Sequence, residues 1–102
     1  MPFIAAYIWS VAPQHEAEFL TRSSELRAHE ERLGAVIGGY RVGSGANEGQ
    51  IVFTATFDTA AQHATWFEAV TNDSESAKIL AELGDHDGWA MTSVDTYTTL
   101  VW

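Results

Sequence analysis

The stretch FIAAYIWSV, residues 3–11, decides the fold. It is dense in β-branched and aromatic residues and therefore predicts a β-strand. Successive side chains of a strand point to opposite faces of its sheet. Here both alternating sets are apolar, with Phe3, Ala5, Tyr7 and Trp9 on one face and Ile4, Ala6 and Ile8 on the other. A strand that is apolar on both faces is expected to be covered on both faces.

The rest of the chain surrounds this strand with elements in the order β-α-β-β-α-β, and residues 1–102 are expected to form a single domain. Pro13 opens a helix predicted over 13–33, and Gly34 ends it. Further strands are predicted over 35–42, 50–57 and 90–102. A second helix begins at Asp58 or Thr59 and is expected to break and restart at Asn72, which forms a capping box with Glu75. This order predicts the α+β, ferredoxin-like βαββαβ fold, with both helical segments on one face of a four-stranded antiparallel sheet.

Composition excludes several classes of function. The chain has 14 acidic and 5 basic residues and a net charge of -9, so nucleic acid and anionic membranes are poor partners. It has no cysteine, which excludes disulfides, thiolate metal sites and a cysteine nucleophile. The N-terminus lacks a basic leader, and no apolar run approaches the roughly 20 residues of a membrane span. We therefore expect a soluble, cytoplasmic protein.

The sheet face that the helices leave open is also predicted to be apolar. It would carry Ile4, Ala6, Ile8 and Val52 together with several threonines. Such a face exposed to water forms an apolar patch, and the same face of a second copy would cover it. The sequence therefore predicts a two-fold homodimer.

Several ordinary features of the chain also form a family pattern. Glu18-Phe19-Leu20 follows Pro13 in the first helix, Gly45-Ala46-Asn47-Glu48-Gly49 lies in the central hairpin, and Phe57-Asp58 ends the third strand before an aromatic helix. Over essentially its whole length the sequence resembles the dimeric α/β-barrel superfamily, and is most similar to NIPSNAP-like and antibiotic-biosynthesis-monooxygenase-like single domains. The resemblance implies a dimer that closes into an α/β barrel. In several members a ligand pocket lies between the sheet and the helices of each subunit.

Members of this superfamily include cofactor-independent oxygenases, lactone isomerases and haem-degrading enzymes. The haem-degrading branch has an asparagine on the first strand, a tryptophan near the end of the third and a histidine late in the second helical segment. This sequence has Tyr7, Phe57 and about Ile79 at those places, and His63 lies about four helical turns earlier. The resemblance therefore does not extend to haem degradation, and no cofactor is expected.

The candidate site centres on His63 and Trp66, which lie three residues apart on the second helix. One interpretation is a core stripe with a histidine at its edge. The other is a general base beside an aromatic wall, because imidazole titrates near neutral pH. We predict His63 and Tyr7 as catalytic groups, and the substrate-binding residues as Trp9, Ser23, Phe53, Phe57 and Trp66. Ser23 is small and lies on the inward stripe of the first helix, where it could leave room for a ligand.

Two other patterns in the sequence involve charged or metal-binding side chains. Glu30 lies close to the inward stripe, and since an unpaired buried carboxylate is costly it is expected to reach solvent or pair with an arginine. His86 stands between Asp85 and Asp87 in a loop, which suits at most an adventitious surface cation. No spacing matches a known zinc or facial-triad motif, so no metal site is predicted.

Two functions of different class follow. The first is a small-molecule-binding dimer acting on a hydrophobic, aromatic or polyketide-like compound, as a cofactor-independent monooxygenase or as an isomerase or cyclase. The second is a non-catalytic binding or structural dimer with a filled core. A cavity between helices and sheet, with His63 and Tyr7 pointing into it, would favour the first function.

Overall fold

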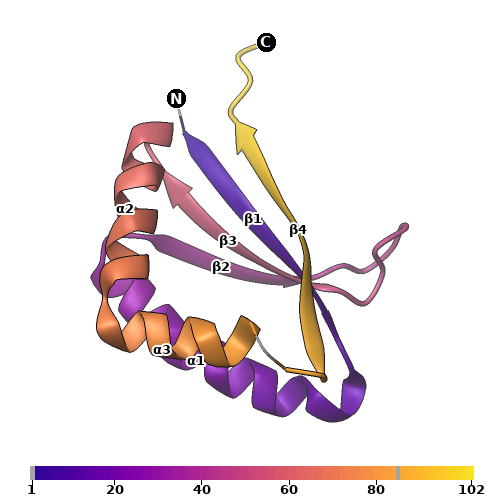
Figure 1. The fold of residues 1–102 in the computed structure, drawn as a ribbon. Helices are drawn as coiled ribbons and strands as arrows, with labels where there is room; N and C mark the ends of the chain where they lie inside the picture. The colour runs from indigo at the N-terminus through magenta and orange to yellow at the C-terminus, as the bar shows by residue number, and fades with distance from the viewer. Residues whose placement is uncertain (1, 85) are drawn as a thin grey trace.

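The computed structural model describes residues 2–84 and 86–102 of the 102-residue chain (Figure 1). The described elements follow the predicted order, and the second helical segment is divided into two helices, as the expected break predicted. In chain order they are β1 (Phe3–Val11), the 3-10 turn η1 (Pro13–His15), α1 (Glu16–Arg32), β2 (Val36–Arg41), β3 (Ile51–Phe57), α2 (Ala60–Asn72), α3 (Ser74–Gly84) and β4 (Trp89–Thr98). The α+β, ferredoxin-like fold is thereby confirmed.

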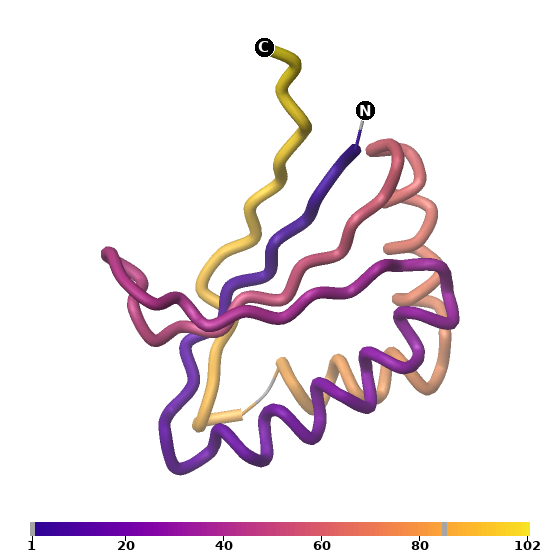
Figure 2. Tube along the Cα trace, turned by 180° about the vertical axis from the view of Figure 1, so that it is seen from behind, coloured from indigo at the N-terminus to yellow at the C-terminus, as the bar shows by residue number. Residues whose placement is uncertain are grey.

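The four strands form one antiparallel sheet in the order β2-β3-β1-β4, so β1 is central, as its two apolar faces predicted. Figures 1 and 2 show the helices on the same side of the sheet, with α1 beside α3. The register pairs Tyr7 with Phe53 and Val94, and Trp9 with Ile51 and Met91. Directly paired residues share a face, so these side chains all belong to the face on which the helices lie.

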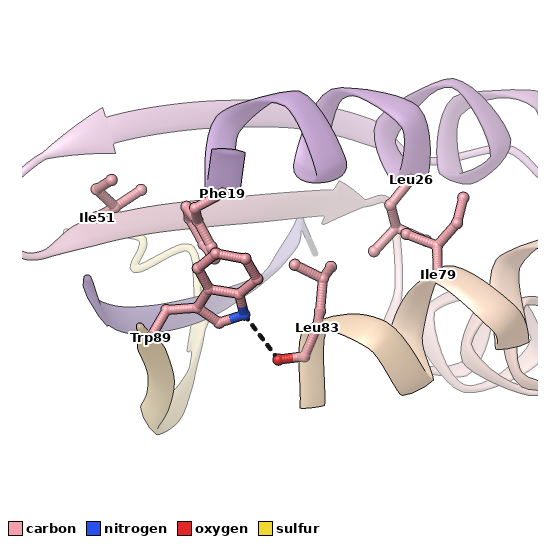
Figure 3. Close-up of a cluster of buried hydrophobic side chains, with 6 residues drawn as sticks. All are labelled: Phe19, Leu26, Ile51, Ile79, Leu83 and Trp89. Carbon is pink, nitrogen blue, oxygen red and sulfur yellow. Dashed lines mark hydrogen bonds between the residues drawn. The ribbon is translucent and has the colours of Figure 1, made fainter. Parts of the chain in front are cut away.

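Phe19 on α1 is the centre of one hydrophobic cluster. Its side chain is fully buried, stacks on Phe53 and meets the rings of Trp9 and Trp89 at centroid separations of 5.2 and 5.4 Å. The indole nitrogen of Trp89 donates a hydrogen bond of 2.9 Å to the carbonyl of Leu83, which ties the end of α3 to the start of β4 (Figure 3). The buried members of this cluster are Phe19, Leu26, Ile51, Ile79, Leu83 and Trp89.

A second cluster holds α2 against the other end of the sheet. Its buried members are Ala35, Ala55, Phe57, Trp66 and Val70, with Phe3, Tyr7, Leu33, Ile37 and Leu80 packed against them. The helices are therefore anchored at two separate points along the sheet.

The helix boundaries differ from the prediction in two places. The first helix begins with a 3-10 turn at Pro13 and becomes α-helical only at Glu16. The second helical segment breaks at Asp73, not Asn72, because the Asp73 carboxylate accepts hydrogen bonds from the Ser76 amide at 3.1 Å and the Ser76 hydroxyl at 2.7 Å. These bonds, together with Arg32, lower the pKa of Asp73 below its usual range. The predicted cap at Thr59 is confirmed, since its hydroxyl accepts the Gln62 amide hydrogen.

The last strand is shorter than predicted, because β4 ends at Thr98 and residues 99–102 lie outside the sheet. The sheet face opposite the helices differs in detail from expectation. Ala6 and Ile8 are already buried within one chain, each flanked by a neighbouring strand on both sides. The large apolar side chains exposed on this face belong to the edge strands, with Val36 69%, Tyr40 62% and Tyr97 51% exposed. Among the described residues, no helix is both long and apolar enough to cross a membrane.

We predict that Phe19→Ala lowers the free energy of unfolding by about 3–5 kcal/mol, because it empties the centre of the first cluster. Urea denaturation at neutral pH measures this. The neighbouring Leu20→Ala is the matched control, since Leu20 is 40% exposed, and it should cost about 1 kcal/mol or less. Equal losses for the two variants would contradict the assignment of Phe19 as the core anchor.

Candidate functional site

A cavity of about 700 Å³ lies between the sheet and the helices. Its wall includes members of both hydrophobic clusters, so it occupies the space between the two anchoring points. Of the predicted site residues, the five that line it are Tyr7, Trp9, Ser23, Phe53 and Trp66. The core under the sheet is therefore not filled, in contrast to the second sequence-based hypothesis.

Edge strand β2 contributes Ile37 and two glycines to the cavity wall. Gly38 and Gly39 both line the cavity, and Gly39 lies directly opposite Phe53 on the helix-facing side. A Cβ at Gly39 would make only ordinary contacts of 3.5 Å with the Phe53 ring. The glycine therefore leaves space that a side chain could occupy without disturbing the sheet.

His63 and Phe57 were predicted to be site residues, and the structure places neither in the cavity wall. Phe57 is buried in the second cluster. His63 lies behind Tyr7, surrounded by the rings of Phe3, Phe57, Trp66 and Phe67. The helical period correctly put His63 on the same stripe as Trp66. Along that stripe, however, His63 packs against the end of the sheet, and the residues that line the cavity begin at Trp66.

The Tyr7 hydroxyl joins His63 to the cavity. It lies 3.2 Å from Nε2 of His63, within hydrogen-bonding distance. Burial lowers the pKa of His63 below its usual range, so the imidazole is neutral at physiological pH. In the tautomer that carries its proton on Nε2, the ring donates to the Tyr7 oxygen and leaves the phenolic O–H free for the cavity. His63 therefore positions Tyr7, and Tyr7 presents itself to the cavity.

Glu30 is half-buried on α1, so it keeps the partial access to solvent that was expected, but it does not pair with an arginine among the described residues. It lines the cavity, and its carboxylate makes no hydrogen bond or ion pair within residues 2–84 and 86–102. The nearby arginines are engaged elsewhere, Arg27 with Glu31 and Arg32 with Asp73. Its position near the inward stripe was visible in the sequence, but the direction of the arginine side chains was not.

The backbone of Glu30 is held firmly. Its carbonyl accepts hydrogen bonds from Trp66 Nε1 at 3.1 Å and from the Ala35 amide at 3.2 Å. Burial raises the pKa of the Glu30 carboxyl to about 7, and the charge of Glu31 adds to the shift. The carboxyl is consequently close to half ionised at neutral pH, the condition under which a general base works best.

The charge of Glu30 acts on Tyr7, which lines the same cavity. Burial, and to a lesser extent the negative charge of Glu30, raise the pKa of Tyr7 to about 12. The phenol thus keeps its proton while the carboxyl can lose one. Two titratable groups whose pKa values are held apart in this way can serve as a hydrogen-bond donor and a base in the same reaction.

Ser23 supplies a third polar group. Its hydroxyl is buried and has no hydrogen-bond partner among the described residues, although it borders the cavity. It precedes Glu30 by seven residues on α1, which is two helical turns or roughly 10 Å along the same face. A buried hydroxyl without a partner is unfavourable unless a ligand or water completes its bonding.

Comparison with known proteins supports the fold. The chain superposes on a NIPSNAP family protein from Agrobacterium tumefaciens with a TM-score of 0.73 and 15% identity, covering 98% of this chain and 92% of that one. An uncharacterized NIPSNAP domain protein from Burkholderia xenovorans gives 0.75 and 13%, covering 98% and 96%. A proposed antibiotic biosynthesis monooxygenase from Bordetella bronchiseptica gives 0.68 and 17%, covering 98% of both chains.

The chain has the fold of these proteins. No protein-family profile matches the sequence, and no curated protein is significantly similar to it. The resemblance predicted from the sequence is therefore confirmed at the level of the single-chain NIPSNAP-like fold.

We predict that Glu30→Gln stabilises the protein at alkaline pH. Between the unfolded value of 4.5 and the folded value of about 7, the native state binds more protons than the unfolded state, so the free energy of unfolding falls as pH rises through this window. Glutamine removes that loss. The advantage of the variant should grow by up to about 3 kcal/mol between about pH 4 and about pH 8.

Chemical denaturation across this pH range measures the effect. Glu25→Gln is the control, because Glu25 is exposed on the same helix, and it should leave the pH profile unchanged. A constant difference between Glu30→Gln and the wild type at all pH values would show that Glu30 is not buried in its charged form.

Proposed function

We propose that the protein is a homodimeric enzyme that removes a proton from an activated carbon of a hydrophobic, aromatic or polyketide-like compound without a cofactor. The observation that carries the proposal is the Glu30 carboxyl, which has no hydrogen-bond or ion-pair partner among the described residues and borders an apolar cavity together with the protonated hydroxyl of Tyr7. An unpaired carboxyl in an apolar site lowers the stability of a protein. Proton transfer is a function that requires such a carboxyl and therefore explains its presence.

Binding of the compound would come mainly from apolar contacts. Trp9, Phe53 and Trp66 offer aromatic surface to a flat ring system, and a cavity of about 700 Å³ lies within the range typical of small-molecule sites. Ser23 would bond a polar group at the end of the ligand remote from Glu30. Water displaced by the ligand would leave Glu30 in a drier site, which strengthens it as a base.

The chemical step would begin at a C–H bond acidified by a neighbouring carbonyl or phenol group. Glu30 would take the proton, and the electron pair of the C–H bond would delocalise onto the substrate oxygen as an enolate or phenolate. Tyr7 would donate a hydrogen bond to that oxygen, where the negative charge develops. His63 would fix the Tyr7 hydroxyl through the 3.2 Å contact without touching the substrate.

Oxygenation is our preferred continuation, because the similar folds include proposed antibiotic biosynthesis monooxygenases. The carbanion would transfer electrons to molecular oxygen and form a C–O bond, giving a peroxide anion that takes up one proton to become a hydroperoxide. Loss of water from the hydroperoxide would leave a ketone, so that a methylene group and O₂ become a carbonyl group and H₂O. An isomerase or cyclase would share the first step and differ only in where the carbanion reacts.

Dimerisation is part of the proposal. Val36, Tyr40 and Tyr97 expose apolar area at the two edges of the sheet face opposite the helices, and half-buried Ile4 and Val52 lie between them. The Tyr97 hydroxyl is 3.4 Å from the Asp95 carboxylate on the same edge strand. Packing this face on its copy would remove the patch from water while leaving the cavity on the opposite side of each sheet.

A test of the proton transfer uses anthrone, a tricyclic ketone with an acidic methylene group. Under anaerobic conditions in D₂O, we expect the protein to accelerate deuterium exchange of the methylene hydrogens. Glu30→Gln should slow this exchange by roughly 100- to 10,000-fold, whereas Glu25→Gln should not. The rate should rise with pH through the Glu30 pKa of about 7 and level off above it.

Admitting oxygen then separates the continuations. Oxygen uptake with formation of the diketone supports a monooxygenase, and exchange without oxygen uptake supports an isomerase or cyclase. If anthrone binds in the cavity and exchange is no faster than with Glu30→Gln, proton abstraction by Glu30 is wrong.

Native mass spectrometry tests the assembly. We expect a dimer, and Tyr40→Glu on the open face should convert it to a monomer because it would bury a charge at the interface. Leu20→Glu, a substitution on the helical layer, is the control and should remain dimeric. A monomeric wild type would contradict the predicted α/β barrel.

A further inference from the structure

A cluster of metal-binding side chains lies outside the Glu30 site. His15 stands at the junction of η1 and α1, Glu18 lies in the first turn of α1, and His86 comes from the segment before β4. The Glu18 Oε2 atom is 3.8 Å from His15 Nδ1 and 3.9 Å from His86 Nε2. One ligand atom from each residue lies within 4.8 Å of the other two.

The two imidazoles are held in place by their surroundings. The His86 ring stacks on Trp89 with the planes 4° apart and the centroids 3.7 Å apart, and it meets His15 edge-on at 5.3 Å. Gly88 packs so closely against His15 that a Cβ at this position would overlap the ring. The Ala12 amide donates to the Gly88 carbonyl at 2.8 Å, which joins η1 to the start of β4.

We propose that His15, Glu18 and His86 bind a divalent transition-metal ion. Two imidazoles and one carboxylate are the donor set of several three-ligand zinc and iron(II) sites, in which water or substrate fills the remaining positions. A tetrahedral zinc ion with bonds of about 2.1 Å requires donor atoms roughly 3.4 Å apart. The three atoms therefore need to approach one another by roughly 0.4 to 1.4 Å.

Charge around the cluster favours a cation. The chain has a net charge of -9, and Glu18 places a carboxylate between the two imidazoles. The competing cation is Arg22, which lies 3.8 Å from the other carboxylate oxygen of Glu18 but has its close ion pair with Glu82. Oε2 of Glu18 therefore remains accessible to a metal ion while Arg22 stays paired.

Metal binding would change one hydrogen bond in a recognisable way. His86 Nδ1 accepts the Gly88 amide hydrogen at 2.8 Å, so the neutral ring carries its own proton on Nε2. Coordination through Nε2 moves that proton to Nδ1, where it faces the Gly88 amide. The Gly88 bond must then break, and this gives the site a signature that loose surface binding would not produce.

His86 also lines the cavity of the Glu30 site, whereas His15 and Glu18 do not. An ion held by the three residues would thus lie at the border of the cavity and fix the wall formed by His86 and Trp89. The proposal does not depend on the proposed reaction, since the ion would bind without a ligand in the cavity.

Isothermal titration calorimetry of the chelator-treated full chain with Zn²⁺ tests the site. We expect one ion per chain, and we expect His15→Gln, Glu18→Gln and His86→Gln each to weaken binding by more than the roughly 10- to 100-fold typical of outer-sphere changes. His29→Gln is the matched control. His29 lies 3.4 Å from Glu75 and so forms a histidine–carboxylate pair without a second imidazole, and its loss should leave zinc binding unchanged.

Amide NMR spectra of the wild type supply a readout that does not depend on the variants folding. Zinc should shift the Gly88 amide resonance in proportion to its occupancy. The proposal is overturned if no stoichiometric binding occurs, if binding survives in the folded His15→Gln/His86→Gln double variant, or if the Gly88 resonance stays in place at saturation.

Discussion

The structure depends on how the helix-facing side of β1 is covered. That side carries the large rings of Phe3, Tyr7 and Trp9, with Ala5 between the first two. The helices contact it in two clusters, one around Phe19 and one around Trp66, and these clusters lie toward opposite ends of the strand. Two anchoring points hold the helical layer in place while the space between them stays open. The cavity is therefore a consequence of how the core is divided, and its walls are as rigid as the clusters that bound it.

A carboxyl in this cavity lowers the stability of the folded protein, and contacts outside the cavity fix its position. Glu30 is held by two hydrogen bonds to its own carbonyl, from Trp66 and from Ala35. The same indole that closes the second cluster thereby fixes the helix end that carries the carboxyl. Its position is set by packing and by the backbone, which leaves both carboxylate oxygens available. Proteins commonly give up some stability at such positions because the group is required for function.

The fold could be predicted from the sequence because its signals are local. The two apolar faces of β1 indicated a central strand, and Thr59 indicated the start of α2. The break between α2 and α3 was placed one residue early, because Asn72 and Asp73 are both good capping residues. The three-dimensional path of the backbone selects Asp73, since it brings the Ser76 amide to the Asp73 carboxylate. The identity of the cavity-lining aromatic residues was also accessible, since alternation in β1 and β3 assigns them to one face.

Assignment of the chemical groups required three-dimensional information. His63 and Trp66 share a helical stripe, but whether a residue on that stripe meets the cavity or the sheet end depends on where α2 crosses the strands. Glu30 was expected to reach solvent or to pair with an arginine. The nearby arginines proved to be paired with Glu31 and Asp73, and Glu30 lies half-buried in the cavity wall. His15 and His86 are distant in sequence, so no spacing rule could bring them together. Local patterns determine faces, whereas contacts between distant segments determine which polar groups meet.

The glycine at position 39 gives this architecture a way to diversify. The edge strand presents bare backbone to the cavity at this position. The volume available to a guest is therefore larger than it would be if residue 39 had a side chain. Adding a methyl group would reduce the size of the guest that can be accommodated, and its contacts of 3.5 Å with Phe53 require no change in strand pairing. Selection could therefore alter the size of the accepted molecule through one codon, independently of the residues that act on it.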